Sequence, residues 1–198
     1  MPQSIKDGSR SEGPGTDLDE ARLLERARDG DGDAFSALVT PYRDRLIAMC
    51  DRITTNRADS EDALQLTLLA AWQHLGRFEG RSGFSTWLYR IAYNAAIGIV
   101  RRNLPEPVAL LSVGDDAPGP EGRVTDREVV RWALRRIPVD YRAAIVLREI
   151  GSLSYEEIAL TQGIPIDTVK SRIFRARAAL RLLLAEGGST DAPPEQDP

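Results

Sequence analysis

Apolar residues recur at three- and four-residue steps through two long stretches of the chain, which is the pattern of helices with one buried face. The first stretch, residues 20–102, contains "DAFSALVTPYRDRLIAMCDRI", "DALQLTLLAAWQHL" and "TWLYRIAYNAAIGIVRR". The second, residues 125–185, contains "TDREVVRWALRRI", "VDYRAAIVLREIG" and "LSYEEIALTQGIPIDTVKSRIFRARAALR". Neither stretch shows the strict alternation of a half-buried strand. The pattern therefore predicts an all-α protein with two small helical domains.

Three segments interrupt this pattern. Residues 103–124 contain four prolines, and we expect a flexible linker because a compact domain seldom carries so long a loop without secondary structure. Residues 1–19 and 186–198 are rich in Gly, Pro, Ser and acidic residues, and are predicted to be disordered tails.

Charge is divided unevenly between these parts, although the formal net charge is only −4. Residues 1–20, 103–126 and 182–198 together hold 14 acidic and 3 basic residues, which leaves 16 acidic and 23 basic residues in the helical parts. Basic folded parts favour a polyanionic partner such as nucleic acid. A solvated charged surface is the alternative.

Cysteine and histidine occur once each, as Cys50 and His74, which excludes an intramolecular disulfide and a zinc site built from Cys and His. We predict no metal and no cofactor. No apolar run approaches the roughly 20 residues of a membrane span, and the N-terminus lacks the apolar core of a secretory signal. We therefore expect a cytoplasmic protein that does not insert into membranes.

Residues 153–181 have the pattern of a helix-turn-helix. Ser154 is placed to cap a first helix in a capping box with Glu157, and Gly163 is placed to end it. Asp167 or Thr168 would then cap a second helix, whose inner face is predicted to consist of Val169, Ile173, Ala176 and Leu180. Cations cover the rest of that helix, as expected for a helix inserted in a DNA major groove. Phe174 is compatible with a thymine-methyl contact and with packing against another helix.

The end of the first stretch has features that suit single-stranded nucleic acid. A wheel with 3.6 residues per turn places an aromatic residue, two arginines and an amide on one face, namely Trp87, Arg90, Asn94 and Arg101. The loop before this helix carries Arg77, Phe78, Arg81 and Phe84. Exposed bases stack on aromatic rings while arginines contact phosphates. The alternative is that the aromatic residues are core residues of a small helical bundle.

Two blocks together resemble the extracytoplasmic-function (ECF) subfamily of bacterial RNA polymerase sigma factors. "DALQLTLLAAWQHLGRFEGRSGFSTWLYRIAYNAAIGIVRR" is similar to sigma region 2, and "RRIPVDYRAAIVLREIGSLSYEEIALTQGIPIDTVKSRIFRARAALR" is similar to region 4. The resemblance implies a non-enzymatic subunit that binds RNA polymerase core through the β′ clamp and the β flap and directs it to promoter DNA. It further implies a cognate anti-sigma factor, a regulator that holds many family members inactive.

The resemblance also implies roles for particular residues. The residues that would bind polymerase core are Asp59, Glu61, Asp62 and Gln65. The residues that would melt and capture the promoter −10 element are Phe78, Arg81, Ser82, Phe84, Trp87, Arg90, Asn94 and Arg101. The residues that would read the −35 element as duplex are Thr168, Lys170, Ser171, Arg172, Phe174 and Arg175. The chain departs from the family pattern at Leu66, where an acid is common, at Gly98, where Asp is common, and at Asp167, where Gly is common.

Two other functions are compatible with parts of the chain. A helix-turn-helix regulator that does not engage polymerase would have no reason to carry the 59–87 block. A DNA-acting enzyme could use Asp59, Glu61 and Asp62 as metal ligands, but these three positions do not share one helix face, and no nucleophile–base pair is evident.

Overall fold

The computed structural model describes residues 14–103 and 125–187, and these residues form helices and connecting turns without a strand. The all-α prediction is confirmed. The predicted linker and tails lie largely outside the described residues. The N-terminal tail was predicted too long, because a helix already begins at Pro14. Proline is favoured at the first helical position, where its fixed φ suits the helix and its missing N–H would have no partner.

Two helices up to Pro41 form one compact unit, α1 (Pro14–Arg28) and α2 (Gly32–Val39). Asp31 caps α2 by accepting hydrogen bonds from the backbone N–H groups of Asp33 and Ala34, both at 3.0 Å. The same carboxylate pairs with Arg26 at 2.6 Å. One side chain therefore begins α2 and ties it to α1.

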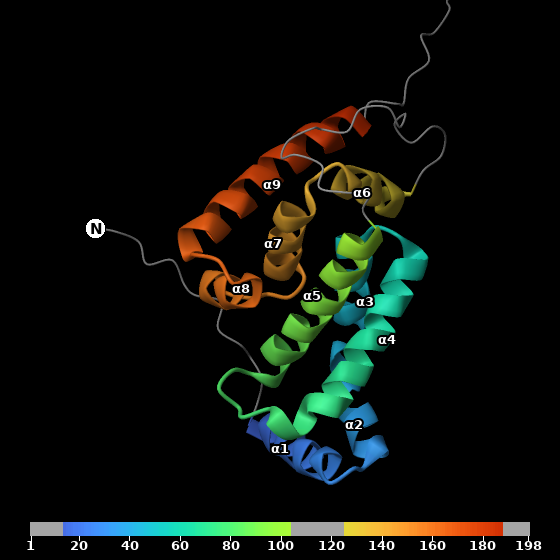
Figure 1. Cartoon of the computed structure of the whole chain (residues 1–198), viewed down its shortest axis with the longest axis vertical. Helices are drawn as coiled ribbons and strands as arrows, with labels where there is room; N and C mark the ends of the chain where they lie inside the picture. The colour runs from blue at the N-terminus through green and yellow to red at the C-terminus, as the bar shows by residue number, and fades with distance from the viewer. Residues whose placement is uncertain (1–13, 104–124, 188–198) are drawn as a thin grey trace, which may run out of the picture. The chain divides into compact units, whose positions relative to one another are not determined.

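The second unit contains all later helices. Its first part is a three-helix bundle in which each helix contacts the other two, made of α3 (Arg43–Thr54), α4 (Arg57–His74) and α5 (Phe84–Asn103) (Figure 1). Two short 3-10 turns, η1 (Thr40–Tyr42) and η2 (Leu75–Arg77), precede α3 and follow α4. The core of the bundle is apolar, with Leu46, Met49, Cys50 and Ile53 of α3 fully buried.

The second part of this unit contains α6 (Asp126–Arg135), α7 (Val139–Glu149), α8 (Tyr155–Gln162) and α9 (Ile166–Gly187). Thr125 and Glu128 form a capping box at the start of α6. The second helix of the predicted helix-turn-helix, α9, continues without a break to Gly187. Its later turns keep an inward apolar residue, Leu183, which is 8% exposed and extends the buried face that begins at Val169.

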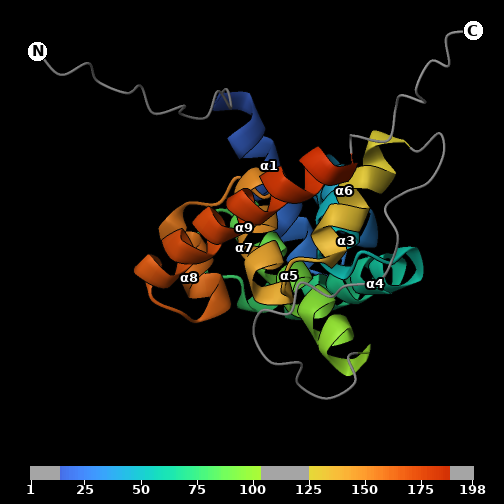
Figure 2. The same ribbon diagram turned by 90° about the horizontal axis from the view of Figure 1, so that it is seen from above.

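Helix α7 is buried on every side. Its residues 143–147 are all apolar and buried, and five successive helical positions, 100° apart, cover the whole circumference. It contacts α9 and α8 on one side and α3 and α5 of the three-helix bundle on the other (Figures 1 and 2). The sequence predicted two separate modules and did not predict this contact between them.

Arg142 lies in the same helix and is buried, and no acidic side chain among the described residues pairs with it. Its Nη1 donates to the Leu134 carbonyl oxygen at 2.9 Å, and the Nε has no hydrogen-bond partner. Burial, with a smaller contribution from the charge of Arg135, lowers the pKa of Arg142 to about 10. The guanidinium is therefore held in an environment that disfavours its charge.

Candidate nucleic-acid interface

Helices α8 and α9 form the predicted helix-turn-helix. Ser154 accepts from the backbone N–H of Glu157 at 3.1 Å, and the Glu157 carboxylate accepts from the backbone N–H of Ser154 at 2.7 Å. Gly163 ends α8 with a φ of +66°, in the left-handed region that favours glycine. The capping box and the glycine stop are thus confirmed.

The predicted cap of the second helix was wrong. The carbonyl oxygen of Pro165 accepts from the N–H groups of Thr168 and Val169, so α9 begins at Ile166, before both predicted caps. Proline holds its own φ close to the helical value, which lets the first turn form directly after the turn between the helices. Asp167 instead pairs with Lys170 at 3.0 Å.

The outer face of α9 is accessible over the residues predicted to read duplex DNA. Lys170, Ser171, Phe174 and Arg175 are exposed and Thr168 is half-buried, whereas Val169, Ile173 and Ala176 are buried. Leu180, the fourth member of the predicted inner face, is half-buried. Because the apolar and cationic faces are separated around one helix, α9 can pack on α7 while it presents its cations outward.

Phe174 is 70% exposed, so its ring does not pack internally. The sequence was compatible with two roles for Phe174, a contact with a DNA base and packing against another helix. The ring lies on the outer face of α9, which excludes packing against another helix. An aromatic side chain held out among cations is suited to an apolar contact with a base edge.

Arg172 occupies a different environment from its neighbours on α9. Its side chain is 19% exposed and lies 3.3 Å from the carboxylate of Asp140. It also donates to Oε1 of Gln162 at 3.0 Å and lies 5.9 Å from the ring of Tyr141. Arg172 therefore joins α9 to α7 and α8, and a contact between its guanidinium and DNA would have to replace these bonds.

The aromatic residues predicted to contact a melted strand form one cluster. The ring centroids of Phe78 and Trp87 lie 5.2 Å apart. The ring centroid of Phe84 lies 5.7 Å from that of Phe78 and 5.6 Å from that of Trp87. Phe78 and Phe84 are buried, and Trp87 is half-buried. Phe78 and Phe84 are therefore core residues, which was the alternative prediction for the aromatic residues. Part of the Trp87 ring remains accessible.

The polar residues of the same predicted site remain accessible. Arg90 and Asn94 are exposed on one side of α5, and Arg81 and Ser82 are exposed in the loop before it. Arg81 pairs with Glu79 at 2.6 Å. Arg101, two turns beyond Asn94, is exposed and lies 3.6 Å from Asp140 of α7. The structure therefore brings the arginines, the amide and Trp87 to one side of α5, as the sequence predicted.

The acidic residues predicted to bind polymerase lie in the first turns of α4. The helix is capped by Asn56, whose side-chain oxygen accepts from the backbone N–H of Asp59 at 3.3 Å. Asn56 takes the cap because its backbone is extended, with φ −130° and ψ 135°, and the chain turns helical directly after it. Glu61 pairs with Arg57 at 3.0 Å, and Asp62 is exposed.

Apolar residues extend this surface along α4, which sequence reasoning missed in part. Leu66, Leu69 and Trp72 are 43%, 52% and 37% exposed, and the first two share a helix face with Asp62 and Gln65. Leu66 was noted in the sequence as a departure from the family pattern, whereas Leu69 and Trp72 were not singled out. The sequence feature that indicates this exposed apolar surface is the number of large apolar residues in α4, which exceeds what one buried helix face can hold.

Two further observations limit the chemistry of the described residues. Within residues 14–103 and 125–187, no three His, Cys, Asp or Glu side chains lie close enough together to hold a metal ion. In the same residues, no helix combines the length and the apolar character needed to cross a bilayer.

Comparison with known proteins identifies these two modules. Residues 38–104 match the family model of sigma-70 region 2, and residues 127–180 match that of sigma-70 region 4. The RNA polymerase sigma-H factor of Pseudomonas aeruginosa is 35% identical over 180 residues, covering 83% of this chain and 93% of the relative. The ECF RNA polymerase sigma-E factor of Escherichia coli K12 is 36% identical over 178 residues, covering 82% and 93%. The chain belongs to the ECF family of RNA polymerase sigma factors.

A solved structure supports the same assignment for the fold of this sigma factor. The sigma factor RpoE of Bartonella quintana, solved in complex with the anti-sigma factor NepR, is 28% identical with a TM-score of 0.62, covering 76% of this chain and 96% of that chain. We call α3–α5 the region 2 helices and α6–α9 the region 4 helices. Members of this family are transcription initiation factors, and family membership assigns that function to the chain in preference to the two alternatives.

Proposed function

We propose that this sigma factor docks on polymerase core through the exposed face of α4, captures the melted −10 strand with α5 and its preceding loop, and reads the −35 duplex with α9. The accessible outer face of α9 is the observation that carries the proposal. Lys170, Phe174 and Arg175 offer two cations and an aromatic ring to a major groove. No acidic side chain interrupts residues 168–181 of that helix.

The face of α4 suits a protein partner better than a nucleic acid. Acidic side chains repel phosphates, whereas exposed leucines beside acidic residues suit a helical partner that carries both apolar and basic residues. The contact proposed on the β′ clamp coiled coil uses Asp62, Gln65, Leu66 and Leu69. The β flap remains the proposed second contact of polymerase, on the region 4 helices.

Reconstituted transcription tests the function as a whole. The pure protein is added to core polymerase, and run-off transcripts are sequenced from a genomic library. We expect transcripts from a limited set of promoters that share −10 and −35 sequences. Absence of core binding would refute the proposal.

Arg175→Ala tests the role of α9. If Arg175 contacts a phosphate, affinity falls for all promoter sequences and the slope of log affinity against log salt decreases by about one. If it contacts a base, preference relaxes at one −35 position instead. Core association should stay unchanged in both cases. Arg172→Ala is the comparison variant, and because its guanidinium is bonded within region 4 we expect it also to lower the unfolding temperature.

Leu69→Glu tests the core contact. Leu69 is 52% exposed, so the change removes little internal packing but places a charge in the proposed interface. We expect core affinity to fall at least tenfold. Leu182→Glu makes the same change at a leucine that is 68% exposed on α9. It is the matched control when affinity is measured for an isolated β′ clamp fragment, because the proposed β flap contact of the region 4 helices is absent from that fragment. Equal core affinity in both variants and the unmodified protein would remove α4 from the interface.

Control by an anti-sigma factor is the last part of the proposal. It is supported by the complex in which the Bartonella quintana relative was solved. Affinity purification of the sigma factor from its own cells should yield, besides polymerase subunits, one protein that displaces core in a purified competition assay. Recovery of polymerase subunits alone under every growth condition would count against such a regulator.

A further inference from the structure

One acidic residue lies on the face of α9 that the proposed function turns toward DNA. At about 100° per residue, Asp167 is about 40° from Ser171 and about 20° from Phe174 around the helix. Val169 and Ala176, which are buried, lie about 160° and about 180° from it. Asp167 therefore lies in the middle of the outer face of α9.

The carboxylate of Asp167 is accessible. Its side chain is 92% exposed, and its one polar partner among the described residues is Lys170, whose Nζ donates to Oδ1 at 3.0 Å. The Lys170 side chain is itself 57% exposed. Exposed ion pairs contribute little to stability, so this pair is not needed to hold α9 in place.

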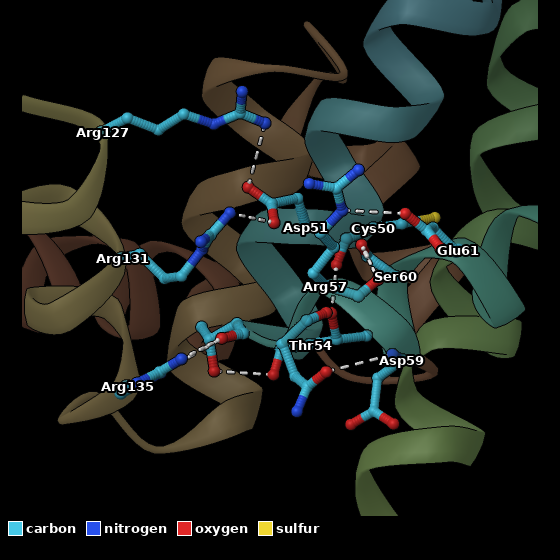
Figure 3. A network of polar contacts seen from close by, with 12 residues as sticks. Cys50, Asp51, Thr54, Arg57, Asp59, Ser60, Glu61, Arg127, Arg131 and Arg135 are labelled. Carbon is cyan, nitrogen blue, oxygen red and sulfur yellow. Dashed lines mark hydrogen bonds and ion pairs between the residues drawn. The ribbon is translucent and has the colours of Figure 1, made fainter. Parts of the chain in front are cut away.

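Carboxylates with a structural role have different surroundings in this protein. Asp51 is 4% exposed and lies 2.7 Å from Arg131 and 3.6 Å from Arg127 of α6 (Figure 3). Asp31 caps α2 and pairs with an arginine of α1. Each of these carboxylates joins two elements, whereas Asp167 contacts only a residue of its own helix. Its position therefore indicates a role toward a binding partner.

The chemistry of the carboxylate restricts the bases that Asp167 can contact. An ionised carboxylate accepts hydrogen bonds and donates none. In the major groove of duplex DNA, the base-edge donors are the exocyclic amino groups, N4 of cytosine and N6 of adenine. Guanine and thymine present acceptors and a methyl group there. Asp167 can therefore form a hydrogen bond with cytosine or adenine, and not with guanine or thymine.

The other residues of this helix face make different contacts. Asp167 is the only carboxylate between Ile166 and Arg181. The Ser171 hydroxyl both donates and accepts, and the Phe174 ring offers an apolar contact. Asp167 thus adds a base preference that the cations and the ring of α9 cannot supply.

Lys170 makes an acidic side chain tolerable next to DNA. Its charge offsets that of the carboxylate, which phosphates would otherwise repel. An ammonium group has three donors, and Asp167 takes one of them, which leaves two for DNA. In every base pair an amino group lies beside a keto oxygen in the major groove, and the strand that carries the amino group sets its place there. The ion pair offers an acceptor beside a donor, which is complementary to such an edge.

We propose that Asp167 is a specificity-determining residue, which accepts a hydrogen bond from the exocyclic amino group of one cytosine or adenine in the −35 element. Lys170 holds the carboxylate in place and contacts the same base pair or the adjoining phosphate. This inference rests on the proposed function of α9 and makes it more specific.

Selection from a promoter library tests this role. The library randomises the −35 element upstream of a fixed −10 element, and polymerase reconstituted with each sigma variant selects the fragments that it binds. We expect the unmodified protein to prefer cytosine or adenine on one strand, at one −35 position, by at least about fivefold. Asp167→Ala should lose the preference at that position and keep those at other positions. Asp167→Asn should favour adenine there, because an amide can bond both N6 and N7.

Base analogues identify the bonded atom and distinguish cytosine from adenine. In the selected promoter, 2-pyrimidinone replaces the cytosine, or purine replaces the adenine, and each change removes only the amino group. The affinity of the unmodified protein should fall at least about fivefold on the changed fragment, whereas Asp167→Ala should bind both fragments equally. Equal losses in the two proteins would overturn the proposal, because the amino group would then have another partner.

Asp33→Asn is the matched control for the change of charge. Asp33 is exposed and, like Asp167, is the second residue of its helix. The two substitutions therefore have the same effect on net charge and on a helix N-terminus. Asp33→Asn should leave every base preference unchanged. The same shift of preference in both variants would overturn the proposal, since it would not depend on position 167.

Two further results separate this proposal from the proposed function. A uniform rise in the affinity of Asp167→Ala for all fragments, with unchanged preferences, would mean that the carboxylate only repels phosphates, and would overturn this proposal alone. Absence of any base preference in the −35 element with the unmodified protein, although it binds core, would refute the proposed reading by α9 and this proposal with it.

Discussion

Replacing Phe174 by alanine should separate stability from promoter binding. A Phe side chain buries about 150–250 Å² when fully covered, so a ring that is 70% exposed removes about 60 Å² from water. At about 25 cal/mol/Å² this is at most about 1.5 kcal/mol, and the better helix propensity of alanine returns about 0.5 kcal/mol. The free energy of unfolding should therefore fall by about 1 kcal/mol or less.

Promoter binding should be affected more strongly. Loss of a base contact costs about 1–3 kcal/mol, so the affinity of reconstituted polymerase for its promoter should fall at least about fivefold. Urea unfolding measures the stability, and fluorescence anisotropy with labelled promoter duplex measures the affinity. Phe84→Ala is the control, because this ring is 3% exposed and its loss should lower the free energy of unfolding by about 3–5 kcal/mol.

Two results would refute the reasoning about Phe174. A loss of stability as large as that of Phe84→Ala would mean that the ring packs internally. Unchanged stability together with unchanged promoter affinity would mean that the ring neither packs nor touches DNA. A changed preference at one thymine-containing position of the −35 element would identify the base it contacts.

The remaining predictions concern the stability and reactivity of other positions. Gly98→Ala should raise the free energy of unfolding by about 0.5–1 kcal/mol, because this helical position is exposed with open space around a Cβ; a lower melting temperature would contradict this. Gly151→Ala should lower it by about 1–3 kcal/mol in the same assay, since its Cβ would lie 2.7 Å from the Leu147 carbonyl oxygen. Arg142→Met should unfold at higher urea concentration than the unmodified protein at pH 7, by about 1 kcal/mol or more, because it removes a buried unpaired charge. Since burial lowers the pKa of Arg142 to about 10, that charge penalty is present below pH 10 and is lost as the pH rises further, so the difference between the two proteins should shrink there. Burial raises the pKa of the Cys50 thiol to about 12, so alkylation at pH 8 should be at least about 100-fold slower in the folded than in the urea-unfolded protein, and equal rates would show an accessible thiol.

Local features of this protein were predictable because they depend on residues a few positions apart. The capping box of Ser154 and Glu157, the stop at Gly163 and the buried Val169 and Ile173 follow from helical periodicity and end geometry. The family resemblance rests on the same local blocks. Helix starts were less certain, as the start of α9 at Ile166 shows, because several neighbouring residues can serve as caps.

Exposure of individual side chains required the tertiary structure. Periodicity shows that a helix has an apolar face, but only its neighbours determine how wide that face is. Leu69 of α4 therefore lies exposed, while Phe78 and Phe84 are buried against other rings. Arg172 likewise fits the cationic pattern of α9, yet its guanidinium bonds to Gln162 and Asp140.

By itself, the sequence determined the helices, the two promoter-reading modules and the family of this sigma factor. Only the tertiary structure decided that the region 4 helices pack on the region 2 helices and that Asp51 is buried beneath Arg131. These two residues are 80 positions apart, and neither has a neighbour in sequence that signals the other. A contact of this kind leaves no periodic trace along the chain, because it depends on the packing of whole helices and not on the spacing of residues within one.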